Sequence, residues 1–227
     1  VVIRLIGSDY SVLKLAVFRN FFAVIPLLVL LFISKEFTTL FKNVNKKFLS
    51  LCCFRGLCFL AMNIFIFISV INVEFATAMT LTFSSPFFIV ILSIIFLQDK
   101  VGIYRWSAII IGFIGVILIL RPTSEIFNFF SIFSILTAFA WGVTVMILKF
   151  IPPNFSTSKI QFYTLIFNVI GALTLFIILL NDFTVNSMKD LMLMVLTGIL
   201  GGTAAILFVY AYRLISLSKL ASFEYFG

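Results

Sequence analysis

The side chains in this sequence that could do chemistry are few. Histidine is absent, and the three cysteines, Cys52, Cys53 and Cys58, lie within one apolar run. Enzyme sites and zinc sites are most often built from His, Cys and paired carboxylates. The sequence contains no paired carboxylates and no Gly-rich phosphate loop. We therefore expect no enzyme, no metal and no other cofactor, and we interpret the cysteines as small hydrophobes.

A polar stripe is predicted on one helix of the apolar run 75–98. Thr77, Thr80 and Ser84 are spaced i, i+3, i+7 and so share a helix face. Pro86 cannot donate to the carbonyl of Thr82, which predicts a kink there. A stripe beside a freed carbonyl suits a solute-binding groove, and hydrogen bonding between helices is the alternative.

A second stripe is predicted on the run 127–148, where Ser134, Thr137, Trp141 and Thr144 share a face. The indole of Trp141 could stack on a planar solute. Tryptophan also anchors many membrane proteins at the interface, although position 141 falls well inside this run. Both interpretations stay open.

The run 190–212 combines a packing motif with two polar candidates. Gly198 and Gly202 have the GxxxG spacing that lets helices approach closely, and packing is their expected role. Thr203 and Tyr210 share another face and are candidates to reach a cavity.

Three charged residues fall within or beside apolar runs. Arg19 and Arg55 lie about two turns inside theirs, where an ionisable residue suggests function by default. For Arg55, near a lysine-rich loop, we favour snorkelling or phospholipid contact. Glu224 is a candidate cation or proton site. The full set of predicted solute-binding residues is Asn63, Thr77, Thr80, Ser84, Pro86, Trp141, Thr144, Thr203, Tyr210, Glu224 and Tyr225.

The composition and the apolar runs predict the helices on which these residues lie. Of the 227 residues, 63% are hydrophobic and 11% are charged, whereas a soluble domain has about 25% charged residues. Runs of about 20 apolar residues span a bilayer as helices. They cover residues 11–34, 49–71, 75–98, 103–121, 127–148, 159–181 and 190–212, with a stub ending near residue 6 and another run beginning near residue 219. We expect an all-α integral membrane protein with about eight visible helices.

The basic residues orient these helices. If the loop 35–47 is cytoplasmic, ten Lys and Arg residues lie on that side and four on the other, which is a positive-inside bias. The net charge of +8 therefore reflects topology, and we expect the inner (plasma) membrane as the location and no nucleic acid as a partner. The expected partners are the lipid bilayer, a small-molecule solute and, as an open alternative, a second copy of the chain.

The pattern of runs and breaks repeats weakly at a shift of 142 residues, which places Ser69 on Ala211 and Arg19 on Gln161. The repeat predicts two further helices after residue 227, so a complete unit would have ten helices. Because each copy has an odd number of helices, five, the second copy enters the membrane from the opposite side. Such inverted repeats are found in many secondary transporters. We expect a first repeat over 1–122, a second over 123–227, and a sequence that is part of a longer protein.

Several segments resemble the EamA domain of the drug/metabolite transporter superfamily. They are residues 75–86 (FATAMTLTFSSP), 97–100 (LQDK), 106–122 (ending LILRP), 130–149 and 217–226. The nearest branch includes S-adenosylmethionine and riboflavin uptake carriers. Gln98-Asp99 stand where the family has Gly-Glu. The resemblance implies a ten-helix, 5+5 inverted-repeat carrier that moves small organic metabolites by alternating access, such as S-adenosylmethionine, riboflavin or amino-acid-like solutes. The alternative is a structural or channel-like membrane protein.

Overall fold

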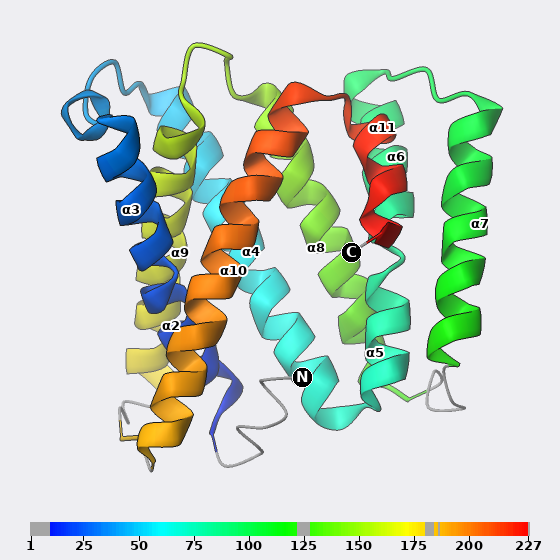
Figure 1. Cartoon of the computed structure of the whole chain (residues 1–227), viewed down its shortest axis with the longest axis horizontal. Coiled ribbons are helices and arrows are strands. Elements are labelled where there is room, and N and C mark those ends of the chain that lie inside the picture. Colours follow the sequence, from blue (N-terminus) through cyan, green and yellow to red (C-terminus); the bar gives the residue numbers. More distant parts are fainter. Residues whose placement is uncertain (1–9, 122–127, 180–183, 186, 227) are drawn as a thin grey trace. The chain divides into compact units, whose positions relative to one another are not determined.

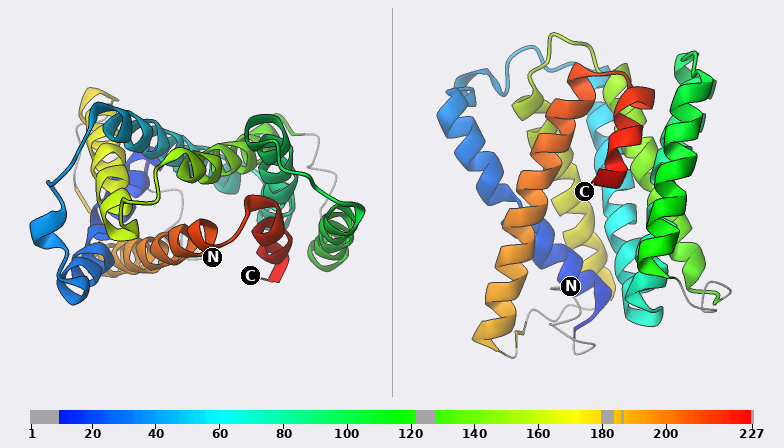
Figure 2. Two further views of the ribbon diagram at one scale, coloured as in Figure 1. Left: turned by 90° about the horizontal axis from the view of Figure 1, so that it is seen from above. Right: turned by 45° about the vertical axis from the view of Figure 1, so that its right-hand side comes forward.

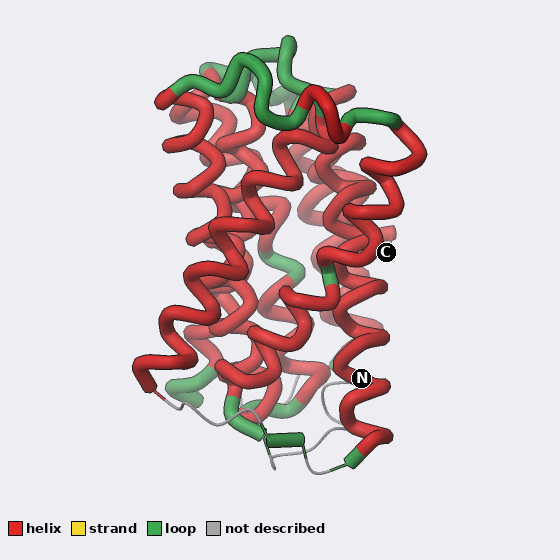
Figure 3. The backbone as a smooth tube through the Cα atoms, turned by 90° about the vertical axis from the view of Figure 1, so that its left-hand side faces the viewer, coloured by secondary structure: helices red, strands yellow, loops and turns green. Residues whose placement is uncertain are grey.

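The computed structural model describes residues 10–121, 128–179, 184–185 and 187–226. Within these ranges every regular element is a helix, and most loops are short (Figures 1 and 3). The elements are α2 (Val12–Phe22), α3 (Val24–Ser34), η1 (Phe37–Thr39), α4 (Lys46–Asn72), α5 (Phe75–Thr82), α6 (Ser85–Leu97), α7 (Ile103–Leu120), α8 (Ser131–Phe150), α9 (Thr157–Leu179), α10 (Met188–Leu214), α11 (Leu217–Ala221) and η3 (Ser222–Phe226). The predicted stub ending near residue 6, and the predicted breaks at 122 and 181–182, lie outside the described residues.

The all-α prediction is confirmed, and the predicted runs match the helices within a few residues. Two runs are interrupted. The run 11–34 divides into α2 and α3 at Ala23, three residues before Pro26. Because proline has no N–H, the carbonyl of Phe22 loses its helical partner, and the helix breaks one turn before Pro26. This break was not predicted.

The second interruption separates α5 from α6 at Phe83 and Ser84. Pro86 occupies the first turn of α6, where its missing N–H leaves no helical bond unmade. The kink predicted from Pro86 is confirmed as a full helix break. The break falls within the polar stripe predicted on residues 77–84 and directly precedes Ser85 of the site described below.

The chain forms two compact units. The first contains residues 1–60 and 150–210, and the second contains residues 61–149 and 211–227. Helices α4 and α10 contribute residues to both. This division follows from packing and does not test the predicted repeats. The repeats over 1–122 and 123–227 stay a prediction.

Glycines bring α10 against α2 and α3 in the first unit. A Cβ atom at Gly198 would lie 2.4 Å from the Cβ of Phe22 and 2.8 Å from the carbonyl oxygen of Arg19. A Cβ at Gly202 would lie 2.8 Å from Cγ of Pro26. The packing role predicted for this GxxxG pair is therefore confirmed.

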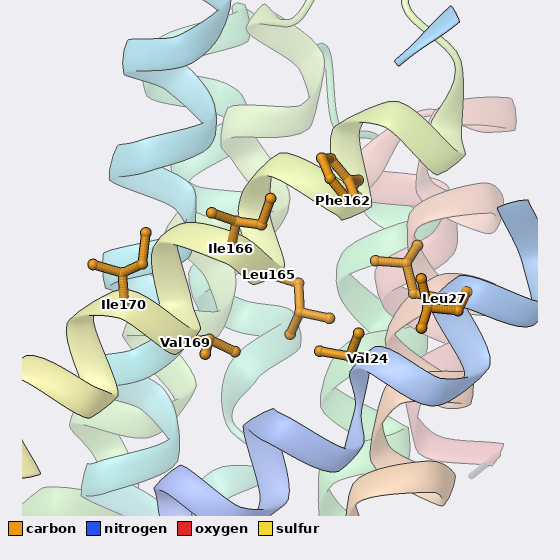
Figure 4. A pocket seen from close by; sticks show the side chains of 8 residues that line it. Val24, Leu27, Phe162, Leu165, Ile166, Val169 and Ile170 are labelled. Atoms are coloured by element: carbon orange, nitrogen blue, oxygen red, sulfur yellow. The ribbon is translucent and has the colours of Figure 1, made fainter. Parts of the chain in front are cut away.

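The first unit also has an apolar groove between α3 and α9 (Figure 4). Its volume is about 200 Å³. The lining side chains are Val24, Leu27, Leu28, Phe162, Leu165, Ile166, Val169 and Ile170. None of them can hydrogen-bond a polar solute, so polar recognition in this unit requires other residues.

Candidate functional site

A carboxylate held by three neutral donors is the most distinctive polar feature of the second unit. The indole Nε1 of Trp141 donates to Oε1 of Glu224 over 2.7 Å, and the hydroxyl of Ser85 donates to Oε2 over 2.9 Å. The hydroxyl of Tyr212 also donates to Oε1. The described interactions of Glu224 thus satisfy both oxygens without a cation.

Four elements bring these groups together. Ser85 begins α6, Trp141 lies in the middle of α8, Tyr212 is in the last turn of α10, and Glu224 lies on η3. Helix α11 packs against α6, and η3 packs against α7, as the red segment beside α7 in Figure 2 illustrates. Glu224 is therefore positioned by a short helical segment that turns back into the unit after α10.

Basic residues fix the turn that precedes η3. The ammonium of Lys149 donates to the carbonyl of Ile215 over 2.6 Å, and Arg105 donates to the hydroxyl of Ser218 over 2.8 Å. Both basic residues belong to the side that the charge bias assigns to the cytoplasm. Within this unit, the ends of α8 and α10 and the beginning of α7 therefore lie at one end.

Aromatic and small side chains continue the site beside Glu224. The ring of Tyr225 stacks on Phe83 with centroids 6.4 Å apart, and a Cβ at Gly112 would lie 2.4 Å from the Tyr225 ring. A hollow of about 440 Å³ lies along α7 and η3, lined by Ala108, Ile111, Gly112, Gly115, Val116, Ser222, Phe223 and Tyr225. A planar or partly apolar group would fit such walls.

The structure brings two of the predicted residues, Trp141 and Glu224, into direct contact. A third predicted residue, Tyr225, follows Glu224 in the sequence. It adds two partners that the sequence reasoning missed, Ser85 and Tyr212. Ser85 adjoins the predicted Ser84, and Tyr212 is two residues after the predicted Tyr210. The signal for both was weak, because a one-residue error in helical register moves a side chain to another face.

The stripe predicted on residues 77–84 is interrupted by the helix break at Phe83 and Ser84. Thr77 and Thr80 are buried on α5, and the hydroxyl of Thr80 donates to the carbonyl of Ala76. Ser84 lies in the break, and its hydroxyl donates to the carbonyl of Leu81. The break falls within the predicted stripe, and the role of Thr77, Thr80 and Ser84 in solute binding stays a prediction.

The stripe predicted on α8 does face the interior. Ser134, Thr137 and Thr144 are all buried. Ser134 shares a 2.6 Å hydrogen bond with Ser69 of α4, whereas Thr144 donates to the carbonyl of Ala140 within its own helix. Asn63 of α4 is also buried. The described contacts thus make Trp141 the member of this stripe that reaches Glu224.

The remaining candidates belong to the first unit. Thr203 and Tyr210 lie on α10 and are exposed, and Thr203 donates to the carbonyl of Ile199. Neither reaches a described polar cluster of this unit. Their role in solute binding stays a prediction.

The structure corrects the interpretation of Arg55. Its side chain is 3% exposed, and its guanidinium donates to Thr164 and Gln161 of α9. The neighbouring residues Phe54 and Leu57 form the outer face of α4, with 55% and 47% of their surfaces exposed. Arg55 therefore points into its unit, and the favoured expectation of snorkelling or phospholipid contact was wrong.

These features define the class of protein. Within the described residues, six helical stretches are long and apolar enough to cross a membrane. They are Val12–Ser34, Lys46–Asn72, Phe75–Leu97, Ser131–Phe150, Thr157–Leu179 and Met188–Leu214. Polar side chains such as Trp141 and Ser134 turn inward, while large apolar ones such as Ile95 and Ile111 stay exposed, as lipid contact requires. The chain is a multi-pass α-helical membrane protein.

Comparison with known proteins identifies the family. The profile of the EamA-like transporter family matches residues 1–121, and the chain belongs to that family. It is 29% identical over 149 residues to a protein named riboflavin transporter from Rhizobium johnstonii, with 65% of this chain and 48% of that protein covered. The chain thus spans about half the length of this relative. Membership in a transporter family agrees with the expectation of a non-enzymatic protein.

A second relative aligns over nearly the whole chain. It is a protein named S-adenosylmethionine uptake transporter from Rickettsia felis, 25% identical over 223 residues, with 98% of this chain and 73% of the relative covered. A crystal structure titled only as that of a protein has the same fold, with a TM-score of 0.72 and 16% identity over 97% of this chain and 76% of the other. The fold is therefore one that a protein of known structure also adopts.

Proposed function

We propose that the protein is a carrier of small organic metabolites. Membership in the EamA-like transporter family is the observation that carries this proposal. Relatives named as transporters of riboflavin and S-adenosylmethionine indicate the solute class to test first. Amino-acid-like solutes complete the panel.

Glu224 is the proposed coupling or recognition group of this carrier. A carboxylate away from water is costly unless hydrogen bonds, a proton or a bound cation compensate it. Here Ser85, Trp141 and Tyr212 supply the hydrogen bonds and no described cation supplies the charge. The group can therefore take up a proton or accept the cationic part of a solute without rearranging its donors.

The proposed architecture is a ten-helix inverted repeat working by alternating access. The match of the family profile to residues 1–121 supports a first repeat ending near residue 122. Helix breaks beside proline in α2–α3 and α5–α6 support it further, because interrupted helices are common around carrier sites. We place the protein in the inner (plasma) membrane, and a homodimer remains part of the proposal.

The test is transport by the full-length protein in vesicles. The proposal predicts saturable uptake of at least one of riboflavin, S-adenosylmethionine and amino acids, with counterflow from preloaded vesicles. Glu224→Gln removes the charge at nearly constant shape, and a coupled carrier should lose accumulation against a gradient while keeping exchange between equal pools.

Glu74→Gln is the matched control, because Glu74 is exposed ahead of α5. Undiminished uphill accumulation by the Glu224→Gln protein would exclude Glu224 as the coupling site. The alternative is a channel-like or structural protein, and flux without saturation or counterflow would favour it over the carrier.

A further inference from the structure

The first unit contains a buried cation that the proposed function has not used. The Arg55 side chain is 3% exposed. Within the part of the chain that the structure describes, it forms no ion pair with a carboxylate. Burying a guanidinium without a partner anion costs free energy, because the charge loses its hydration, and buried charges in proteins are normally paired.

Among the described residues, the hydrogen bonds of the guanidinium all come from one nitrogen, Nη1. Nη1 donates to the hydroxyl of Thr164 over 2.8 Å and, more weakly, to Oε1 of Gln161 over 3.4 Å. Nε is buried and has no hydrogen-bond partner. No described hydrogen bond uses Nη2 either. The edge formed by Nε and Nη2 can hold two oxygens of a carboxylate through parallel hydrogen bonds.

A second unpaired group lies on the helix that faces Arg55. Gln161, Thr164 and Asn168 follow the i, i+3, i+7 spacing and share one face of α9. The side chain of Asn168 is fully buried, and both its Oδ1 and its Nδ2 lack a hydrogen-bond partner. Buried amides without partners are rare in folded proteins, so Asn168 is a second buried polar group that a bound solute could satisfy.

Close packing keeps these groups near one another. A Cβ at Gly56 would lie 2.6 Å from the carbonyl oxygen of Thr164 and 3.1 Å from the backbone nitrogen of Asn168. Residues 55–56 of α4 therefore meet residues 164–168 of α9. The polar groups are covered in this conformation, and the alternating access proposed above would expose them.

We propose that Arg55, Gln161, Thr164 and Asn168 form a binding site for the carboxylate of a transported solute, an inference that rests on the proposed carrier function. One cation with one free edge matches a singly charged carboxylate. The inward direction of Arg55, opposite Phe54 and Leu57, favours a solute over a lipid headgroup. Among the solutes named by the relatives, S-adenosylmethionine carries such a group and riboflavin does not.

The decisive variant is Gln161→Glu. It places a carboxylate beside Nη1 at nearly constant shape, so it neutralises Arg55 internally and should raise the melting temperature. Gln98→Glu is the matched control, since it adds the same charge at an exposed position after α6. The full-length protein in neutral detergent is titrated with sodium benzoate at constant ionic strength, and benzamide serves as the uncharged probe of equal size.

Benzoate should stabilise the wild type and the Gln98→Glu protein against heat, whereas benzamide should not. In the Gln161→Glu protein the affinity for benzoate should fall at least about ten-fold. Unchanged affinity in that variant, or no preference for benzoate over benzamide in the wild type, would overturn the proposal. Stabilisation by phosphatidylglycerol instead of benzoate would also overturn it, in favour of a lipid site.

Asn168→Leu separates binding from a structural role. Because the amide has no partner in the protein to lose, the variant should be at least as stable as the wild type and should bind benzoate more weakly. A destabilised variant with unchanged benzoate affinity would count against the site. Failure of wild-type vesicles to take up any solute would refute the proposed carrier, while the benzoate titration would still decide whether the anion site exists.

Discussion

Replacing Tyr212 by Phe removes one oxygen atom from the Glu224 site. The Tyr212 side chain is fully buried, and its hydroxyl donates to Oε1 of Glu224. The ring keeps its edge-on packing against Trp141, whose centroid is 6.4 Å away. The variant therefore tests the hydrogen bond with little change in packing.

The magnitude depends on the charge of Glu224. A hydrogen bond to a charged group contributes about 1.5–3 kcal/mol, whereas hydrogen bonds between membrane helices average about 0.6 kcal/mol. Trp141 still donates to the same oxygen and Ser85 to the other, so no acceptor is left unsatisfied. We expect the low end of the charged range, about 1.5 kcal/mol, or roughly 3–6 °C in melting temperature.

The assay is a double-mutant cycle on thermal unfolding of the full-length protein, with Tyr212→Phe, Glu224→Gln and the double variant. Tyr104→Phe is the control, because Tyr104 is 87% exposed. Neighbouring groups that interact should give a coupling energy above about 0.5 kcal/mol. Additive effects of the two substitutions would refute the assignment of Tyr212 as a donor to Glu224.

Two further predictions concern packing and topology. Gly198→Ala should destabilise the protein by about 1–3 kcal/mol, because its methyl group would collide with Phe22 and with the backbone of Arg19. Gly115→Ala should be neutral or stabilising, since a Cβ there meets no atom within 4 Å; equal melting temperatures for the two variants would contradict the packing argument. In a cysteine-free background, Lys47→Cys should react with an impermeant thiol reagent only from the inner side, and Thr184→Cys only from the outer side. The reverse labelling pattern would overturn the orientation.

The sequence predicted the helices well because their cause is local. Each apolar run must satisfy its backbone hydrogen bonds internally in lipid, so hydropathy alone specifies helices with nearly correct ends. The break beside Pro86 was predicted for the same local reason, since a missing N–H acts on its own helix. The break beside Pro26 follows the same rule and was not predicted.

Side-chain partners depended on contacts between segments far apart in the chain. Trp141 and Glu224 were predicted as separate candidates, and the packing of α6, α8, α10 and η3 places the indole Nε1 2.7 Å from Oε1 of Glu224. The same packing makes Ser85, and not the predicted Ser84, a hydrogen-bond donor to Glu224. The periodicity of one helix cannot specify which face meets which neighbour.

Arg55 shows the same division between sequence and tertiary structure. The sequence established that a cation sits about two turns inside an apolar run, and hence that it matters. Whether its head group reaches the membrane surface or turns toward α9 depends on the rotation of α4 about its own axis. That rotation is set by the close contact of Gly56 with Thr164 and Asn168, which lie more than a hundred residues further along the chain.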